Sequence, residues 1–194
     1  MAHLTPEEIT ERVAGLPAAP TDNGSVQALF IRPDTDQREV VDTLHAIAGK
    51  GIVGDNYIAR GDSRTADGQS NPEKQIAVMN ASILDVLADG DGDLWKLAGD
   101  QILVDFDLST RNVPAGTRLS IGSTVLEVSN EPHNGCAKFA ERYGMAASRF
   151  VNSDKVERYR GINVMVVQDG DVTVGDSITT VSYTHLTLPT TPYV

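Results

Sequence analysis

The chain has 194 residues, of which 40% are hydrophobic and 22% charged, a composition typical of a single globular domain with a sizeable core. Its formal net charge of −11 argues against nucleic acid or an anionic membrane as a partner of the whole surface. A single cysteine cannot form an internal disulfide, no apolar run approaches the roughly 20 residues of a membrane helix, and the N-terminus lacks signal-peptide features. These observations predict a cytoplasmic protein.

The first predicted element is a short helix. Thr5 is a good N-cap, Pro6 suits the first helical position, and Glu8 can complete a capping box. The helix should run to about Ala14 and end before Gly15. We therefore expect residues 1–24 to form a helix and a linker, followed by a main domain over residues 25–181.

Short strands dominate the next part of the sequence. Alternating or apolar runs predict strands over residues 25–32, 39–48, 75–80, 101–108, 117–121 and 124–129, with a helix over 81–88. Residues 49–72 show no period, and a loop of that length inside a compact domain is usually functional or disordered. Asp169-Gly170 between residues 163–168 and 171–174 predicts a hairpin. This pattern favours a β-rich, barrel-like single domain.

Cys136 lies in a loop of sequence Glu-Pro-His-Asn-Gly-Cys that leads into an amphipathic segment. A helix should begin after the cysteine, end at Gly144 and resume over residues 145–152. A thiol at a helix start meets unpaired backbone N–H groups, which favour the thiolate, and His133 could hydrogen-bond to it. The segment is also locally basic, which indicates either a pocket for a small anion or a solvated helix face; its cations are Lys138, Arg142, Arg149, Lys155, Arg158 and Arg160.

Three groups of motifs occur in a specific order. They are Gly51-Ile52-Val53-Gly54-Asp55-Asn56-Tyr57; residues 100–109 with residues 114–122; and His133-Asn134-Gly135-Cys136 followed by Arg160-Gly161-Ile162-Asn163 and Val174-Gly175-Asp176. In this order they resemble the MOSC family, named after the C-terminal domain of molybdenum cofactor sulfurase, over residues 26–180. The resemblance implies a β-rich α+β fold, a closed β-barrel with peripheral helices. It also implies that the domain binds the molybdenum cofactor (molybdopterin) and that Cys136 ligates the metal or carries sulfur.

The resemblance suggests further site residues. The pterin phosphate would need cationic or N–H donors, for which the candidates are Arg60, Arg64, Arg149 and Arg160, with polar contacts from Gln75, Asn80 and Asn152. Asp55 either orients a pocket arginine or caps the turn after Gly54. His133 either polarises the thiol or satisfies loop backbone.

The expected function is oxidoreduction or sulfur transfer through the cofactor and Cys136. The alternatives are a cofactor-free cysteine enzyme that uses His133 with Cys136, and a non-catalytic pterin carrier. This chain alone is not expected to bind pyridoxal phosphate and so to mobilise sulfur from cysteine. We therefore expect a separate protein to donate sulfur, or to donate electrons if the reaction is an oxidoreduction. Many family members have Pro-Cys where this chain has Gly135-Cys136. Residues 182–194 differ from the rest in composition, since they are rich in threonine and contain no Asp, Glu, Lys or Arg. They resemble translated vector sequence, the alternative being a genuine disordered tail.

Overall fold

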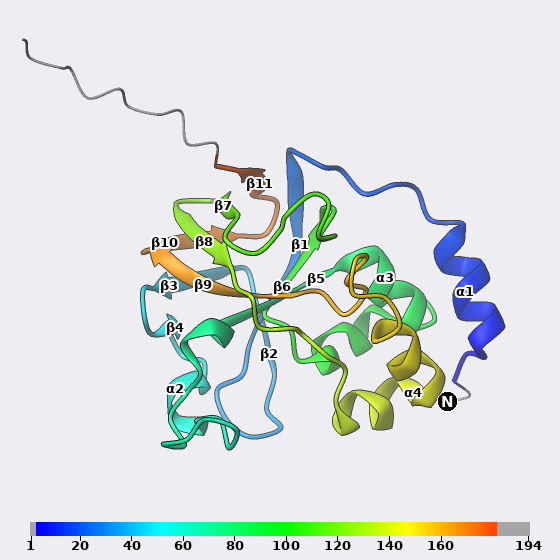
Figure 1. The fold of residues 1–194 in the computed structure, drawn as a ribbon, viewed down its shortest axis with the longest axis horizontal. Helices are drawn as coiled ribbons and strands as arrows, with labels where there is room; N and C mark the ends of the chain where they lie inside the picture. Colours follow the sequence, from blue (N-terminus) through cyan, green and yellow to red (C-terminus); the bar gives the residue numbers. More distant parts are fainter. Residues whose placement is uncertain (1–2, 182–194) are drawn as a thin grey trace, which may run out of the picture.

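The computed structural model describes residues 3–181 of the chain (Figure 1). The two expectations for residues 182–194 therefore concern residues outside the described part. No helix within residues 3–181 is long and apolar enough to cross a membrane. The helices are α1 (Pro6–Ala14), α2 (Tyr57–Arg60), α3 (Ala81–Leu87) and α4 (Ala137–Val151), with short 3₁₀ turns η1 (Pro72–Lys74) and η2 (Gly92–Ala98). The strands are β1 (Gly24–Ile31), β2 (Glu39–Val41), β3 (Thr43–Ile47), β4 (Gly51–Ile52), β5 (Ile76–Asn80), β6 (Ile102–Asp105), β7 (Arg118–Ile121), β8 (Thr124–Val128), β9 (Ile162–Gln168), β10 (Gly170–Thr173) and β11 (Ser177–Thr180).

A closed barrel forms the centre of the molecule. Its strands follow the order β11-β7-β8-β9-β5-β6-β1, and β11 pairs with the first residues of β1 to close the sheet. The β5–β6 pair is parallel and the other neighbours are antiparallel. β2 extends the sheet beside the other end of β1. The prediction of a β-rich closed barrel with peripheral helices in one domain is confirmed, because closure through β11 leaves the barrel strands paired on both sides.

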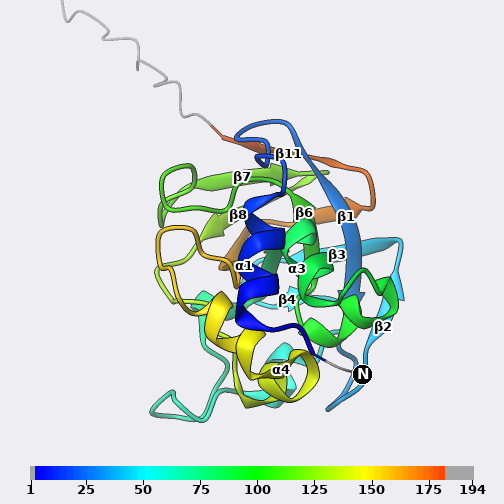
Figure 2. The same ribbon diagram turned by 90° about the vertical axis from the view of Figure 1, so that its right-hand side faces the viewer.

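Alternating side chains divide the hydrophobic residues between two cores. On β6, Ile102 and Val104 point into the barrel, whereas Leu103 points out to the helices. The outer core lies between the barrel wall and helices α1, α3 and α4, which cover the same side of the barrel in Figure 2. Ile9 of α1 is 1% exposed in this outer core, so the predicted N-terminal helix packs on the domain. Its capping box between Thr5 and Glu8 is present as predicted.

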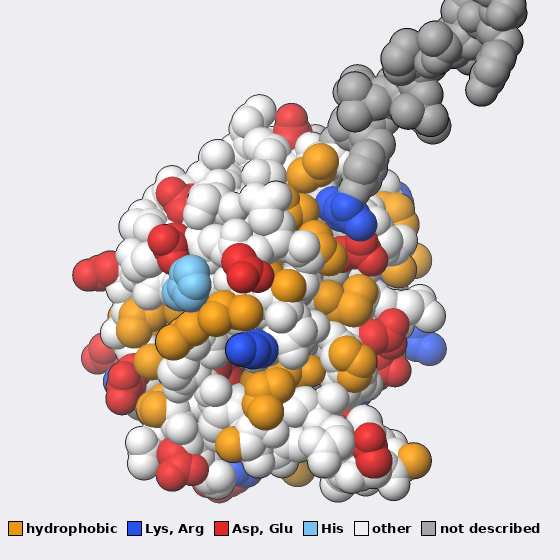
Figure 3. Space-filling view, turned by 90° about the vertical axis from the view of Figure 1, so that its left-hand side faces the viewer, with side chains coloured by type: hydrophobic (Ala, Val, Ile, Leu, Met, Phe, Trp, Pro, Cys, Tyr) orange, Lys and Arg blue, Asp and Glu red, His pale blue; other side chains and the backbone are white. Residues whose placement is uncertain are grey.

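A second sheet, of order β10-β3-β4, lies beside the barrel. Residues 39–48, predicted as one strand, form two strands that belong to different sheets: β2 pairs with β1, whereas β3 pairs with β10 and β4. The hairpin predicted at Asp169-Gly170 is wrong. β9 pairs with β5 and β8, and the chain then crosses at Gly170 to pair β10 with β3. On the side of the molecule that faces the viewer in Figure 3, hydrophobic side chains form patches among scattered acidic ones, and no group of Lys and Arg gathers.

Candidate functional site

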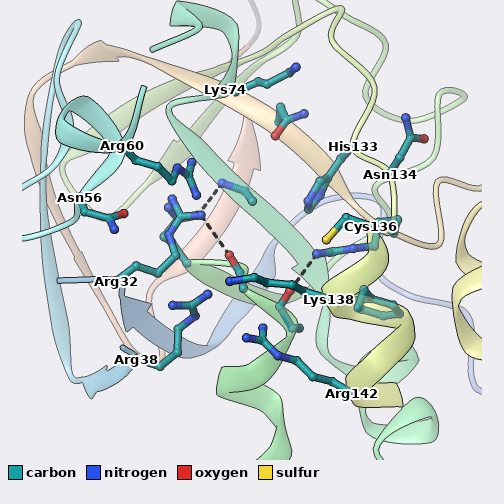
Figure 4. A pocket seen from close by; sticks show the side chains of 18 of the residues that line it. Arg32, Arg38, Asn56, Arg60, Lys74, His133, Asn134, Cys136, Lys138 and Arg142 are labelled. Carbon is teal, nitrogen blue, oxygen red and sulfur yellow. Dashed lines mark hydrogen bonds between the residues drawn. The ribbon is translucent and has the colours of Figure 1, made fainter. Parts of the chain in front are cut away.

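A cavity of about 540 Å³ lies between two walls formed by separate parts of the chain. One wall comes from the β1–β2 loop and the segment after β4, and the other from the cysteine loop and the start of α4 (Figure 4). Eight cationic side chains line it: Arg32, Arg38, Arg60, Arg64, Lys74, Lys138, Arg142 and Arg160. The carboxylates of Asp34 and Asp36 line it as well. Cations therefore outnumber carboxylates in this lining, although the chain as a whole has a net charge of −11.

Arg32 is fixed at the end of β1 by a buried carboxylate. Asp55, whose side chain is fully buried, accepts hydrogen bonds from the backbone N–H of Arg32 at 3.1 Å and from its Nε at 3.0 Å and Nη2 at 3.1 Å. It also accepts from the N–H of Tyr57 at 2.9 Å and from Nε2 of Gln101 at 3.2 Å. Asp55 therefore has both of the roles considered for it: it orients a cavity arginine, and it accepts a hydrogen bond from the turn after Gly54.

Arg38 and Arg60 lie close to Arg32, and no carboxylate within residues 3–181 forms an ion pair with either. Burial lowers the pKa of both guanidinium groups, and the charge of Arg32 lowers it further. Arginine nevertheless stays protonated in proteins, so these groups hold positive charge that nearby carboxylates, Asp55 among them, offset only in part. A bound anion would relieve this repulsion.

The floor of the cavity contains a buried carboxylate and its partners. Asp100 is fully buried, and its two oxygens lie 2.8 and 2.7 Å from Nη1 of Arg160. Burial raises the pKa of Asp100, and the ion pair with Arg160 opposes that rise. Nδ1 of His133 lies 3.5 Å from Oδ1 of Asp100. Burial first, and then the charges of Arg160 and Arg32, hold the pKa of His133 well below 6.5, so this imidazole is neutral at physiological pH.

Cys136 is the N-cap of α4, with an extended backbone and an exposed side chain that makes no cap hydrogen bond. Figure 4 shows it between His133 and Lys138, with its sulfur toward the cavity. Gly144 (φ 89°) interrupts α4 where the sequence predicted a break, and the chain folds back there. The end of α4 thus returns to the cysteine loop, where Oδ1 of Asn152 accepts from the N–H of Gly135 at 2.9 Å. The loop before the thiol is therefore held by the end of the same helix.

Unsatisfied buried atoms mark this cavity. Within residues 3–181, four buried side-chain atoms have no hydrogen-bond partner: Arg38 Nε, Asn56 Oδ1, His133 Nδ1 and Arg160 Nε. All four belong to residues that line the cavity. Because a buried unpaired polar group costs about 1–3 kcal/mol, such a concentration indicates a place for a polar ligand. The set of guanidinium donors with a nearby thiol fits a ligand that combines an anionic group with a thiophilic metal.

The structure brings five of the nine proposed site residues to this cavity: Cys136, His133, Arg60, Arg64 and Arg160. The other four lie elsewhere. Gln75 is buried and bridges Pro72 and Val166, Asn80 caps α3, and Arg149 is exposed outside the cavity; Asn152 acts on the cysteine loop instead of lining the cavity. Within residues 3–181 no three His, Cys, Asp or Glu side chains form a metal-binding group.

Sequence reasoning missed several lining residues, notably Arg32, Arg38, Asn56, Lys74 and Gln101. A signal for one of them was present, since Arg32 is a charged residue at the end of an apolar strand that leads to the barrel rim. Arg38 and Lys74 had no comparable signal, because each belongs to a polar segment whose approach to the cavity depends on the tertiary fold.

Comparisons with known proteins agree with this architecture. A family model of the MOSC domain matches residues 65–179. Among solved structures, the YuaD protein from Bacillus subtilis has a TM-score of 0.59 and 18% identity, with 83% of this chain and 97% of that chain covered. YiiM from Escherichia coli has a TM-score of 0.53 and 17% identity, with 81% of this chain and 70% of that chain covered. YiiM from Geobacillus stearothermophilus has a TM-score of 0.52 and 13% identity, covering 86% and 76%. The comparison with curated proteins found no match.

Proposed function

Because this chain belongs to the MOSC domain family, we propose that its cationic cavity binds the molybdenum cofactor and that Cys136 ligates the metal or carries sulfur. The role would be in oxidoreduction or sulfur transfer. The observation that supports the proposal most directly is the set of unpartnered buried atoms around one cavity that also contains the only cysteine. A family match alone would not say where on this chain the cofactor binds.

The protein groups divide by their chemistry. Arg38 and Arg60, which form no ion pair within residues 3–181, would hold the cofactor phosphate beside the fixed Arg32. Charge-assisted hydrogen bonds to phosphate are worth about 1.5–3 kcal/mol each, so losing two should remove most of the affinity. Asp55 would keep Arg32 in place before the ligand arrives, which avoids the entropic cost of ordering that side chain on binding.

The thiol end of the cavity would perform the chemistry. When bound, the cofactor would supply a metal centre able to change oxidation state or to accept sulfur. Cys136 would be the protein's donor to that centre, since a thiolate is both a soft metal ligand and a sulfur carrier. Neutral His133 would offer a hydrogen bond to the ligand at Nδ1, which has no hydrogen-bond partner within residues 3–181. A separate protein would supply electrons or sulfur.

Elemental analysis tests the proposal. The protein should be expressed in a host that makes the cofactor, purified, and analysed for molybdenum and for pterin phosphate per chain. We expect both in the parent and neither in Arg38→Gln/Arg60→Gln. Lys155→Gln, which changes the charge of an exposed residue outside the cavity, should match the parent. A parent protein that contains neither component, and that binds no purified cofactor, overturns the proposal.

Cys136→Ser distinguishes the alternatives. Loss of molybdenum with retention of pterin supports a metal-ligating thiol. Retention of both supports a non-catalytic pterin carrier. If no cofactor binds but electrophiles label Cys136 in metal-free protein well below the ordinary thiol pKa of about 8.5, and His133→Ala abolishes that labelling, the protein is a cofactor-free cysteine enzyme.

A further inference from the structure

A carboxylate of the protein itself lines the solvent-exposed edge of the cavity, its mouth, and pairs with two cations of α4. Asp36, in the β1–β2 loop, lies 2.5 Å from Nζ of Lys138 and 3.5 Å from Nη2 of Arg142. Its backbone has φ of 59°, in the left-handed region that non-glycine residues rarely adopt. Lys138 and Arg142 stand four residues apart on α4, so both project from the same face of the helix that begins at Cys136.

The two cations are placed by the helix and not by Asp36 alone. Nη1 of Arg142 donates to the backbone oxygen of Leu97 at 2.7 Å, which fixes its guanidinium against η2. Between them on α4 is Phe139, whose ring lies 4.8 Å from Cζ of Arg160. Arg160 is 95% buried, lines the cavity and has an unpartnered Nε. Lys138 and Arg142 thus present two cations on one side of the cavity, and the buried Arg160 in its floor retains an unsatisfied donor.

The contact with Asp36 is weak enough to exchange. The side chains of Asp36 and Lys138 are 58% and 54% exposed, and exposed ion pairs contribute about 0–1 kcal/mol. A carboxylate in solution competes for the same donors without the cost of holding the loop in a left-handed conformation. Asp36 therefore shows that this mouth accepts a carboxylate, and its weak attachment shows that another anion can replace it.

We propose that the substrate of the Cys136 site carries a carboxylate or a similar small anionic group, which displaces Asp36 and binds Lys138 and Arg142. The inference rests on the proposed function, since it assumes that the reaction takes place beside Cys136, whether the thiol ligates the metal or carries sulfur. It goes beyond that function by naming the substrate class and the two residues that select it. Asp36 is then an internal competitor that lowers the affinity for anions.

Two alkylating reagents, one anionic and one neutral, test the proposal without any cofactor. Iodoacetate and iodoacetamide react alike: the cysteine sulfur displaces iodide and forms a thioether, but only iodoacetate carries a carboxylate. The measured quantity is the ratio of their second-order rate constants for Cys136 in metal-free protein, divided by the same ratio for a small free thiol. Because Cys136 is the chain's only cysteine, mass spectrometry reports a single site.

Asp36→Asn should raise this ratio by about two- to fivefold, the factor that corresponds to an exposed charge pair. Lys138→Ala and Arg142→Ala should each lower the ratio by a similar factor, whereas Lys138→Arg, which keeps the positive charge, should have the ratio of the parent. Lys155→Ala removes the same charge from an exposed residue outside the cavity and should leave it unchanged. Raising the salt concentration should reduce the preference for iodoacetate.

Two results would overturn the proposal. If Asp36→Asn accelerates both reagents equally, Asp36 only restrains the loop and the mouth selects no anion. If Lys155→Ala changes the ratio as much as Lys138→Ala does, the effect arises from the overall charge of the protein. These outcomes are independent of the molybdenum measurement, so a protein without cofactor can still show the preference, and a protein with cofactor can lack it. Thermal melting of each variant shows whether it is folded.

Discussion

Removing the carboxylate of Asp55 should destabilise the whole domain. In Asp55→Ala, Arg32 loses its only ion-pair partner within residues 3–181 while its side chain is 10% exposed, so the guanidinium keeps a hydrogen bond to the carbonyl oxygen of Gly99 at 3.4 Å but no ion pair. Breaking a buried pair from one side costs about 3–5 kcal/mol. The N–H of Tyr57 and Nε2 of Gln101 lose their acceptor as well. For a domain of this size each kcal/mol corresponds to about 2–4 °C in melting temperature, so we expect a decrease of about 6–20 °C.

Asp89→Ala is the matched control for this measurement. It also removes an aspartate paired with an arginine, Arg12 at 2.5 Å, but the two side chains are 60% and 45% exposed. An exposed pair contributes about 0–1 kcal/mol, so the control should melt within a few degrees of the parent. Denaturant unfolding of both variants supplies the free energies. If Asp55→Ala loses no more stability than Asp89→Ala, the argument that Asp55 secures the arginine wall of the cavity fails.

Three further predictions concern single side chains. The hydrogen bond from Arg64 lowers the pKa of Asp62 to about 2. The stabilising contribution of the ionised Asp62 is therefore present above the unfolded pKa and is lost as the pH falls through about 2. An NMR titration should show this pKa, and Arg64→Ala should move it toward 3.8. Gly161→Ala places a Cβ at 2.0 Å from a backbone oxygen at φ 90° and should prevent folding, whereas Gly116→Ala, with open space at φ 87°, should cost only the conformational strain of about 1–2 kcal/mol in denaturant unfolding. Asn152→Ala should speed hydrogen exchange at the amide of the glycine before the thiol without a large loss of melting temperature, and equal protection in the variant would contradict its role as a clamp.

The elements that the sequence predicted well are those whose signals are local. The capping box of α1, the helix predicted over residues 81–88 and the break at Gly144 each depend on a few consecutive residues, and each is present in the structure. The prediction of a hairpin at Asp169-Gly170 failed because it used only the local preference of Asp-Gly for turns. The pairing of β10 is decided by β3, more than 120 residues earlier in the chain.

The candidate site was predictable in part for the same reason. Cys136 and His133 belong to one short loop, so the sequence could place them together. The wall opposite them could not be derived that way, because Arg32 and Arg38 reach the cavity from the first strand and its following loop, about a hundred residues from the thiol. Gln75 and Asn80 were selected for polarity alone, and both satisfy backbone groups instead.

Closure of the barrel by β11 on β1 imposes an order on synthesis. β1 leaves the ribosome about 150 residues before β11, so Gly24 and Ser25 must wait for Ile178 and Ser177 before their side of the strand is paired. Until then a nascent chain exposes the open edges of β1 and β7, which are templates for pairing with other chains. A ribosome stalled before residue 177 would therefore present an aggregation-prone open sheet, and such stalled chains should depend on chaperones that the finished barrel does not need.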